Sequence, residues 1–255
     1  MQAGLRRWLL AAIGAVAIAA TVAGVAFAAA SAPVAGGPAG AGVCATEATA
    51  ARSSGTVAAM RVFANCEIGR RLTTLGQVSS ALGASKGFTS SDRAALASMI
   101  AADSAGLTSL KAAIDGQTSI AALKLQVVAI VARYRVYVLL GPQVRLTIAA
   151  DDVLALKPHF DQVSTALAAR IAQARANGRD VSAAQADLGA MNSSVAAAVA
   201  LAAPLPARLL ALTPAQFNAG TASPVLQSVR AAVLKARDDL VTASQDGRKV
   251  LADLA

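Results

Sequence analysis

Apolar residues recur every three or four positions along most of the chain after residue 56, which is the spacing of one face of an α-helix. Capping signals divide this pattern into separate helices. A Thr-Ser-Ser-Asp run that begins at Thr89 is typical of a helix start, and Asp115-Gly116 is typical of the end of that helix. The pattern predicts an all-α protein. The predicted helices cover residues 56–82, 89–115, 118–176, 180–203, a short turn from 213, and 224–254.

The central segment, residues 124–157, holds most of the bulky branched side chains outside the N-terminus and has a Gly-Pro pair at its middle. A proline inside a helix removes a hydrogen bond and clashes with the preceding turn, so Pro142 predicts a kink near residues 138–142. A β-hairpin that pairs residues 135–140 with 143–148 is the alternative, because both runs alternate in polarity. The strongly helical flanks favour the kinked helix.

This central helix has two halves, and each half can pack against two further helices. The sequence therefore predicts an elongated helical bundle, with two three-helix bundles that share a long kinked central helix, as in spectrin-like arrays. The helical region is residues 43–255, with 43–141 and 142–255 as its sub-bundles. If the chain instead folds back at Pro142, a single compact bundle results.

The N-terminus reads as a secretory signal peptide over residues 1–30. Two arginines precede an uncharged run, residues 8–30, that closes with small residues of the A-x-A type. Residues 31–42 form a Pro/Gly/Ala linker. These features predict a protein that is secreted or lies on the extracellular side of the cell envelope. The uncharged run is also long enough to span a bilayer, so an uncleaved membrane anchor is the alternative.

The chain has two cysteines, Cys44 and Cys66, and export permits a disulfide between them. In one straight helix they would lie about 33 Å apart, too far to bond. A helix-breaking run that ends at Gly55, midway between them, folds this region into a helical hairpin and brings the cysteines together. We therefore expect a Cys44–Cys66 disulfide that holds a short N-terminal arm on the first long helix.

Composition and charge add a bias toward anionic partners. Hydrophobic residues make up 56% of the chain, but aromatic residues only 3%; alanine, the best helix former, dominates the rest. The formal charge of +9 falls to +7 when Arg6 and Arg7 leave with the signal peptide. The excess favours an anionic cell-wall polymer or membrane surface as partner. It is spread along the chain rather than clustered, so nucleic acid is disfavoured.

The sequence contains no constellation typical of catalysis. His159 is the only histidine, and a zinc site needs three or four ligands of this kind. The adjacent pairs Asp151-Asp152 and Asp238-Asp239 point about 100° apart on a helix, so neither makes an acid–base couple, and solvated faces are expected. We expect no enzymatic activity, no catalytic residue, no cofactor and no metal site.

One cluster combines basic and aromatic residues: Arg133, Tyr134, Arg135, Tyr137 and Arg145. Guanidinium groups pair with phosphates or carboxylates, and tyrosine rings stack on sugars or bases. The cluster is the candidate patch for an anionic ligand. The alternative is that helical spacing buries some of these residues in the core while the arginines reach outward to solvent.

Three stretches carry a resemblance: GRRLTTLGQVSSALGASKGFTSSDRAALASMI (69–100), YRVYVLLGPQVRLTIAADD (134–152) and ARANGRDVSAAQADLGAM (174–191). With these, the chain resembles a group of uncharacterised exported, alanine-rich helical proteins of Gram-positive bacteria with GC-rich genomes. That group carries no assigned activity, so the resemblance implies export and helicity only.

The sequence thus favours a secreted or envelope-associated, non-enzymatic helical protein that acts by binding or spacing. The alternative is a peripheral binder of an anionic cell-wall polymer or membrane surface through the basic-aromatic cluster. Another envelope protein is a further candidate partner.

Overall fold

A computed structural model describes residues 42–255; the predicted signal peptide and nearly all of the predicted linker lie outside these residues. The described part is built of helices and contains no strand, so the all-α prediction is confirmed and the hairpin alternative is wrong. The helices are α2 (Ala45–Ser54), α3 (Val57–Ala84), α4 (Ser90–Asp115), α5 (Ile120–Arg133), the π-helix η2 (Val136–Leu140), α6 (Gly141–Ala176), α7 (Ser182–Ala202), α8 (Leu205–Leu210), α9 (Pro214–Asn218) and α10 (Ala222–Asp253).

Helices α3, α4 and α5 form the first bundle, and side-chain caps fix where each begins. Thr56, Thr89 and Ser119 each accept a hydrogen bond from a backbone N–H in the first turn of the helix that follows. The inward faces of the three helices supply one apolar core. Its fully buried members include Ile68, Leu75, Leu96, Leu107, Ile114, Leu123 and Ile130.

Helices α6, α7 and α10 form the second bundle around a separate core that is rich in alanine. Small side chains let these helices approach closely: a Cβ added at Gly247 of α10 would lie 3.1 Å from the sulfur of Met191 on α7. A third cluster lies where α8 and the first turns of α10 pack on η2 and α6. The buried members of the second core include Leu167, Ile171, Met191, Ala198, Ala236, Leu240 and Ala243.

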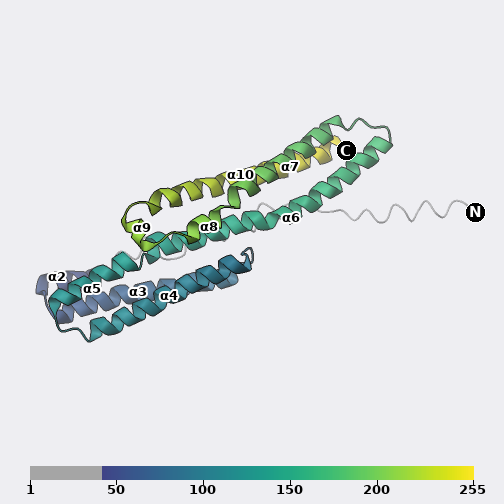
Figure 1. Cartoon of the computed structure of the whole chain (residues 1–255). Helices are drawn as coiled ribbons and strands as arrows, with labels where there is room; N and C mark the ends of the chain where they lie inside the picture. The colour runs from purple at the N-terminus through teal and green to yellow at the C-terminus, as the bar shows by residue number, and fades with distance from the viewer. Residues whose placement is uncertain (1–41) are drawn as a thin grey trace, which may run out of the picture.

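Figure 1 shows the two bundles staggered along α5, η2 and α6, with the α3–α4 end of the first bundle beside the first turns of α6 and with the α4–α5 and α6–α7 loops at opposite ends. The central segment runs from Ile120 to Ala176 and would measure about 85 Å as one unbroken helix at 1.5 Å per residue. The elongated arrangement of two three-helix bundles is therefore present, and the single compact bundle is wrong.

The central helix breaks earlier than the predicted 138–142. Tyr134 (φ −114°, ψ 80°) and Arg135 (φ −80°, ψ 46°) leave helical geometry, and a π-turn follows in which Leu140 N–H donates to Arg135 O at 3.2 Å. Pro142 then lies in the first turn of α6. The reason is that the π-turn directly before Pro142, in which Gly141 N–H donates to Val136 O, widens the helix and accommodates the proline ring and its missing N–H. The break is therefore displaced upstream of the proline.

The disulfide between Cys44 and Cys66 is present, as predicted. Helix α2 ends at Gly55, which takes a left-handed conformation (φ 61°) that other residues rarely adopt, and the chain turns back into α3. This turn brings the two Cα atoms to 5.9 Å. The bond ties α2, whose own buried surface is small, to the middle of α3.

One stretch of the described residues, Ser182–Leu210, is long and apolar enough to cross a membrane by length and composition alone. In the fold it packs on α6 and α10 through the alanine-rich core described above.

The break at Tyr134 turns its ring onto α4, and a substitution there tests this contact. A Cβ added at Gly106 would lie 2.4 Å from the Tyr134 hydroxyl oxygen. We expect Gly106→Ala to lower the free energy of unfolding by roughly 1–3 kcal/mol, as overpacked sites do. Gly76→Ala on α3 meets nothing within 4 Å and should instead stabilise by about 0.5–1 kcal/mol. Urea unfolding of the two variants measures the difference, and equal effects would contradict the contact.

Candidate functional site

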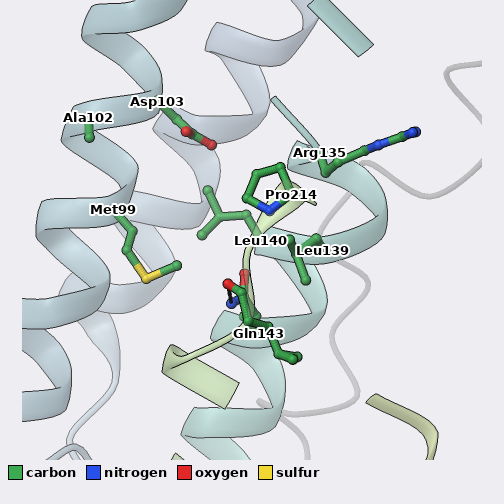
Figure 2. A pocket seen from close by; sticks show the side chains of 9 residues that line it. Met99, Ala102, Asp103, Arg135, Leu139, Leu140, Gln143 and Pro214 are labelled. Carbon is green, nitrogen blue, oxygen red and sulfur yellow. Dashed lines mark hydrogen bonds between the residues drawn. The ribbon is translucent and has the colours of Figure 1, made fainter. Parts of the chain in front are cut away.

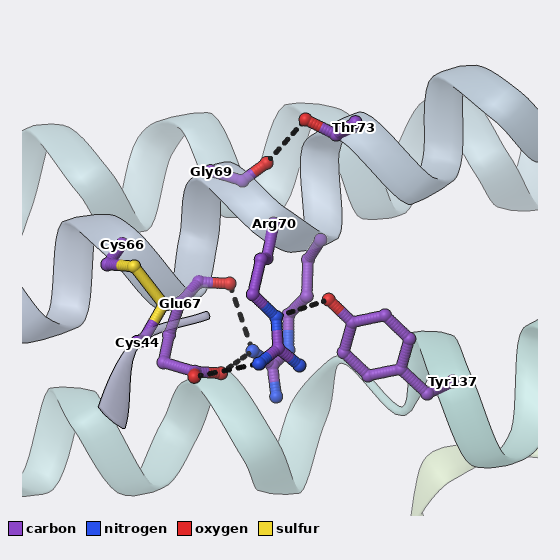
Figure 3. The surroundings of a disulfide bond; sticks show 8 residues. Cys44, Cys66, Glu67, Gly69, Arg70, Thr73 and Tyr137 are labelled. Carbon is purple, nitrogen blue, oxygen red and sulfur yellow. Dashed lines mark hydrogen bonds and ion pairs between the residues drawn. A yellow bond between two sulfur atoms is a disulfide. The ribbon is translucent and has the colours of Figure 1, made fainter. Parts of the chain in front are cut away.

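Tyr137, one of the two tyrosines of the predicted cluster, is held by side chains of α3 (Figure 3). The guanidinium carbons of Arg70 and Arg71 lie 5.1 and 5.2 Å from the centre of its ring, and Arg70 Nε donates to its hydroxyl at 3.3 Å. Glu67 pairs with both arginines. Stacking with cations of the same chain thus occupies the ring that was expected to receive a ligand.

The other members of the cluster face different neighbours. Tyr134 packs on Gly106 of α4 and belongs to the first core. Arg135 turns to α9, where its Nε donates to Asn218 Oδ1 at 2.7 Å and its guanidinium lies over the Phe217 ring. Asn218 in turn donates to the carbonyl of residue 132 at 2.9 Å, which satisfies a backbone acceptor left free where α5 ends.

Arg133 is exposed and Arg145 is partly exposed. Three of the five predicted residues therefore contact three different helices: Tyr137 contacts α3, Tyr134 contacts α4 and Arg135 contacts α9. The five do not form one continuous patch. Sequence reasoning missed the arginines that hold Tyr137, although Glu67 lies three and four residues before Arg70 and Arg71, a spacing that predicts ion pairs on a helix.

A crevice of about 180 Å³ lies where the two bundles meet (Figure 2). Gln143, on the first turn of α6, forms part of its wall and is completely buried. Its side-chain amide donates to the carbonyls of Leu209 (2.8 Å) and Leu212 (3.0 Å), which lie at the end of α8, while its oxygen has no hydrogen-bond partner. The remaining lining residues are Met99, Ala102, Asp103, Arg135, Leu139, Leu140, Leu212 and Pro214.

The chemistry of this crevice is that of a small binding recess. Burial raises the pKa of Asp103 to about 6, so the neutral acid is more populated here than it would be for an aspartate in water at the same pH. Asp103, Arg135 and the Gln143 side-chain oxygen are the polar groups that line the crevice, among otherwise apolar walls.

Asp151, which the sequence placed on a solvated face, is buried, so that expectation is wrong for this residue. Only 1% of it is exposed. Its pKa is raised to about 6, first by burial and then by the nearby carboxylates of Asp92 and Asp152, whereas the backbone N–H of Thr89 opposes the rise. The physical reason for the burial is that the α3–α4 loop and the residues that cap α4, Thr89 and Asp92, lie against α6 at this position.

Asp152 lies against the α3–α4 loop. A Cβ added at Gly87 would lie 2.0 Å from Asp152 Oδ1 and 3.3 Å from its Cα, so the loop backbone approaches α6 as closely as only glycine permits. Burial raises the pKa of Asp152 to about 6 as well. The second pair behaves differently: Asp238 is exposed, and Asp239 pairs with Lys235.

His159 is exposed and makes an edge contact with Phe160. Between residues 42 and 255, no three or more histidine, cysteine, aspartate or glutamate side chains are grouped so that they could hold a metal ion.

Comparison of the chain with protein-family models, with curated proteins and with solved structures gives no match in any of the three.

Proposed function

We propose that the protein acts outside the cytoplasmic membrane as a non-enzymatic helical module that works by binding or spacing. The observation that carries this proposal is the elongated, staggered arrangement of two bundles, each with its own core, along one central helix. Such an arrangement separates two surfaces by a fixed distance.

The disulfide supports the location. Disulfides form and persist in oxidising compartments, which include the cell exterior and the envelope. Cys44 and Cys66 are joined, and no cysteine of the described chain is free. This agrees with the export expected from residues 1–30.

A second candidate is a peripheral binder of an anionic cell-wall polymer. It is favoured by the formal charge of +7 over residues 31–255 and by the exposed Arg133. The tyrosines of the original patch are engaged in packing, so this candidate now rests on the arginines.

Thiol labelling in the producing bacterium tests the proposed location. We expect the full-length protein to fractionate with the envelope or the medium, and its cysteines to react with an alkylating reagent only after reduction. A mass increase before reduction, or recovery in the cytoplasmic fraction, would sink the proposal.

Sedimentation of residues 31–255 with purified cell walls across a salt series separates the two candidates. Binding to an anionic polymer weakens steeply with salt, since exposed charges are screened, and should fall in Arg133→Ala/Arg135→Ala. Arg170→Ala/Arg175→Ala, two exposed arginines of α6, is the matched control. Binding that changes neither with salt nor in Arg133→Ala/Arg135→Ala favours the binding or spacing module over the polymer binder.

A further inference from the structure

The outward face of α5 is apolar. Leu125, Val128 and Val131 are 73%, 62% and 43% exposed, and their three-residue spacing sets them along one side of the helix. The opposite side of α5, with Leu123 and Ile130, is buried in the first core. A helix that is apolar on both sides normally has both sides covered, and among residues 42–255 nothing covers the outward face of α5.

The charges on and beside this face have one sign. Helix α5 carries two charged residues, Lys124 and Arg133, and no acid. Lys124 directly precedes Leu125, and Arg52 reaches the same region from α2. Glu47, the acid of α2, does not line the groove described next.

A groove of about 260 Å³ opens between α2, α3 and α5 beside this face. Its charged members are Arg52 and Lys124, and Val128 belongs both to the groove and to the exposed face. The Cys44–Cys66 bond holds α2 in place as one wall. The other lining residues are apolar: Ala48, Ala51, Met60, Phe63 and Val127.

The covering partner has to be apolar and anionic. A second copy of this chain fits poorly, because a two-fold interface would bring Lys124 and Arg52 of both copies together, and each copy is strongly positive overall. A single free amphiphile could fill the groove, but Leu125 and Val131 lie outside it and are exposed. One acyl chain would leave part of this face in water, whereas a lipid leaflet would cover all of it.

We propose that the outward face of α5 and the adjoining groove dock on an anionic lipid bilayer, an inference that rests on the proposed function for its placement outside the cytoplasm. Leu125, Val128 and Val131 enter the boundary between headgroups and acyl chains. Lys124 and Arg52 lie beside them and pair with lipid phosphates. Docking orients the rod by its first bundle and leaves the second bundle free for a further contact.

A single-tryptophan reporter tests the insertion directly. Trp8 is the only tryptophan, so residues 31–255 contain none. We expect Leu125→Trp in this mature chain to shift its emission to the blue with vesicles of phosphatidylglycerol and phosphatidylcholine, and not with phosphatidylcholine alone. Leu234→Trp, at an exposed apolar position of α10, is the control and should not shift.

Sedimentation of residues 31–255 with the same vesicles measures the energetics. Replacing two exposed aliphatic side chains by asparagine should lower vesicle binding roughly tenfold or more, because apolar area buried in the bilayer is lost. Reversing the charges of the two basic groove residues should also lower binding roughly tenfold or more, because pairing with lipid phosphates is lost. All of these positions are exposed or line the open groove. The test pairs are Leu125→Asn/Val128→Asn and Arg52→Glu/Lys124→Glu, and their controls are Leu234→Asn/Val241→Asn and Arg170→Glu/Arg175→Glu.

Three results would overturn the docking. In the first, the emission of Leu125→Trp and that of Leu234→Trp shift equally with vesicles, or the two control pairs lower vesicle binding as much as the two test pairs do. In the second, the mature chain binds phosphatidylglycerol micelles or monomers but not vesicles, which places a free lipid in the groove. In the third, it binds purified walls but no vesicles, which removes the docking and leaves the proposed function standing.

Discussion

Replacing Asp151 by asparagine should raise the free energy of unfolding at about pH 7 by roughly 1–2 kcal/mol. Burial raises the pKa of Asp151 from 3.8 to about 6. Near neutral pH the folded protein therefore holds an ionised carboxylate in a buried position, and this charge destabilises the folded state. A shift of this size corresponds to about 3 kcal/mol at most, and partial relaxation around the site reduces it. Asparagine keeps the shape, removes the charge and can donate to the Asp92 carboxylate beside it.

The pH dependence follows from the sign of the shift. In the folded state Asp151 binds its proton more tightly than in the unfolded chain, so its stabilising contribution is full below about pH 4 and is lost as the pH rises through about 6. Asp103 and Asp152, whose pKa values burial also raises to about 6, act in the same window. We therefore expect these three carboxyls to make the protein more stable near pH 4–5 than at pH 7.

Urea unfolding at about pH 5 and about pH 7 measures both effects. The Asp151→Asn variant should gain more at the higher pH and show a flatter profile than the parent. Asp238→Asn, at an exposed carboxylate, is the control and should change the free energy of unfolding by less than about 0.5 kcal/mol. An Asp151→Asn variant that is less stable than the parent at pH 7 would mean that the ionised carboxylate is needed, which contradicts the interpretation.

Removing the disulfide should cost about 3 kcal/mol, because the Cys44–Cys66 bond closes a segment of 22 residues. The loss should fall on α2 first. This helix is short and has Ala51 as its one buried residue, so without the bond little apolar surface holds it on α3. The groove beside α5 loses a wall at the same time.

The measurement is urea unfolding and amide hydrogen exchange of Cys44→Ser/Cys66→Ser, with and without reductant. Residues 45–54 should exchange rapidly in the double variant, while the core of α7 and α10 stays protected. Reductant should destabilise the parent and leave the double variant unchanged. If the reduced parent unfolds at the same urea concentration as the oxidised protein, the bond does not carry this stability.

Local signals predicted the helices well, since helix ends depend on residues that are close in sequence. Thr89 begins α4 through its side chain as expected, and the turn at Gly55 placed the two cysteines together. The predicted position of the break in the central helix was wrong because Pro142 indicates only that a regular helix cannot continue through it, not where the irregular residues lie. The position at which the helix breaks depends on the contacts that Tyr134 makes with α4 and Arg135 makes with α9.

The candidate site was predicted less well for the same reason. The burial of Asp151 depends on the approach of the α3–α4 loop, which lies more than sixty positions away in the sequence. The guanidinium groups that occupy Tyr137 come from α3, and the acceptors that fix Gln143 come from α8. Contacts between residues so far apart in the sequence cannot be predicted from the pattern of neighbouring residues. The resemblance to exported alanine-rich proteins and the export itself stay predictions.

The disulfide also changes how the protein would carry mechanical load. A pull applied to the chain ahead of Cys44 passes through the covalent sulfur bridge and enters α3 at Cys66, so α2 and the first turns of α3 bear no tension. About 75 Å of contour, the extended length of the 22 residues between the two cysteines, is thereby kept out of any stretching of the chain. Force would reach the first bundle near the middle of a long helix rather than at its frayed end, where it must shear packed side chains instead of peeling away one turn at a time.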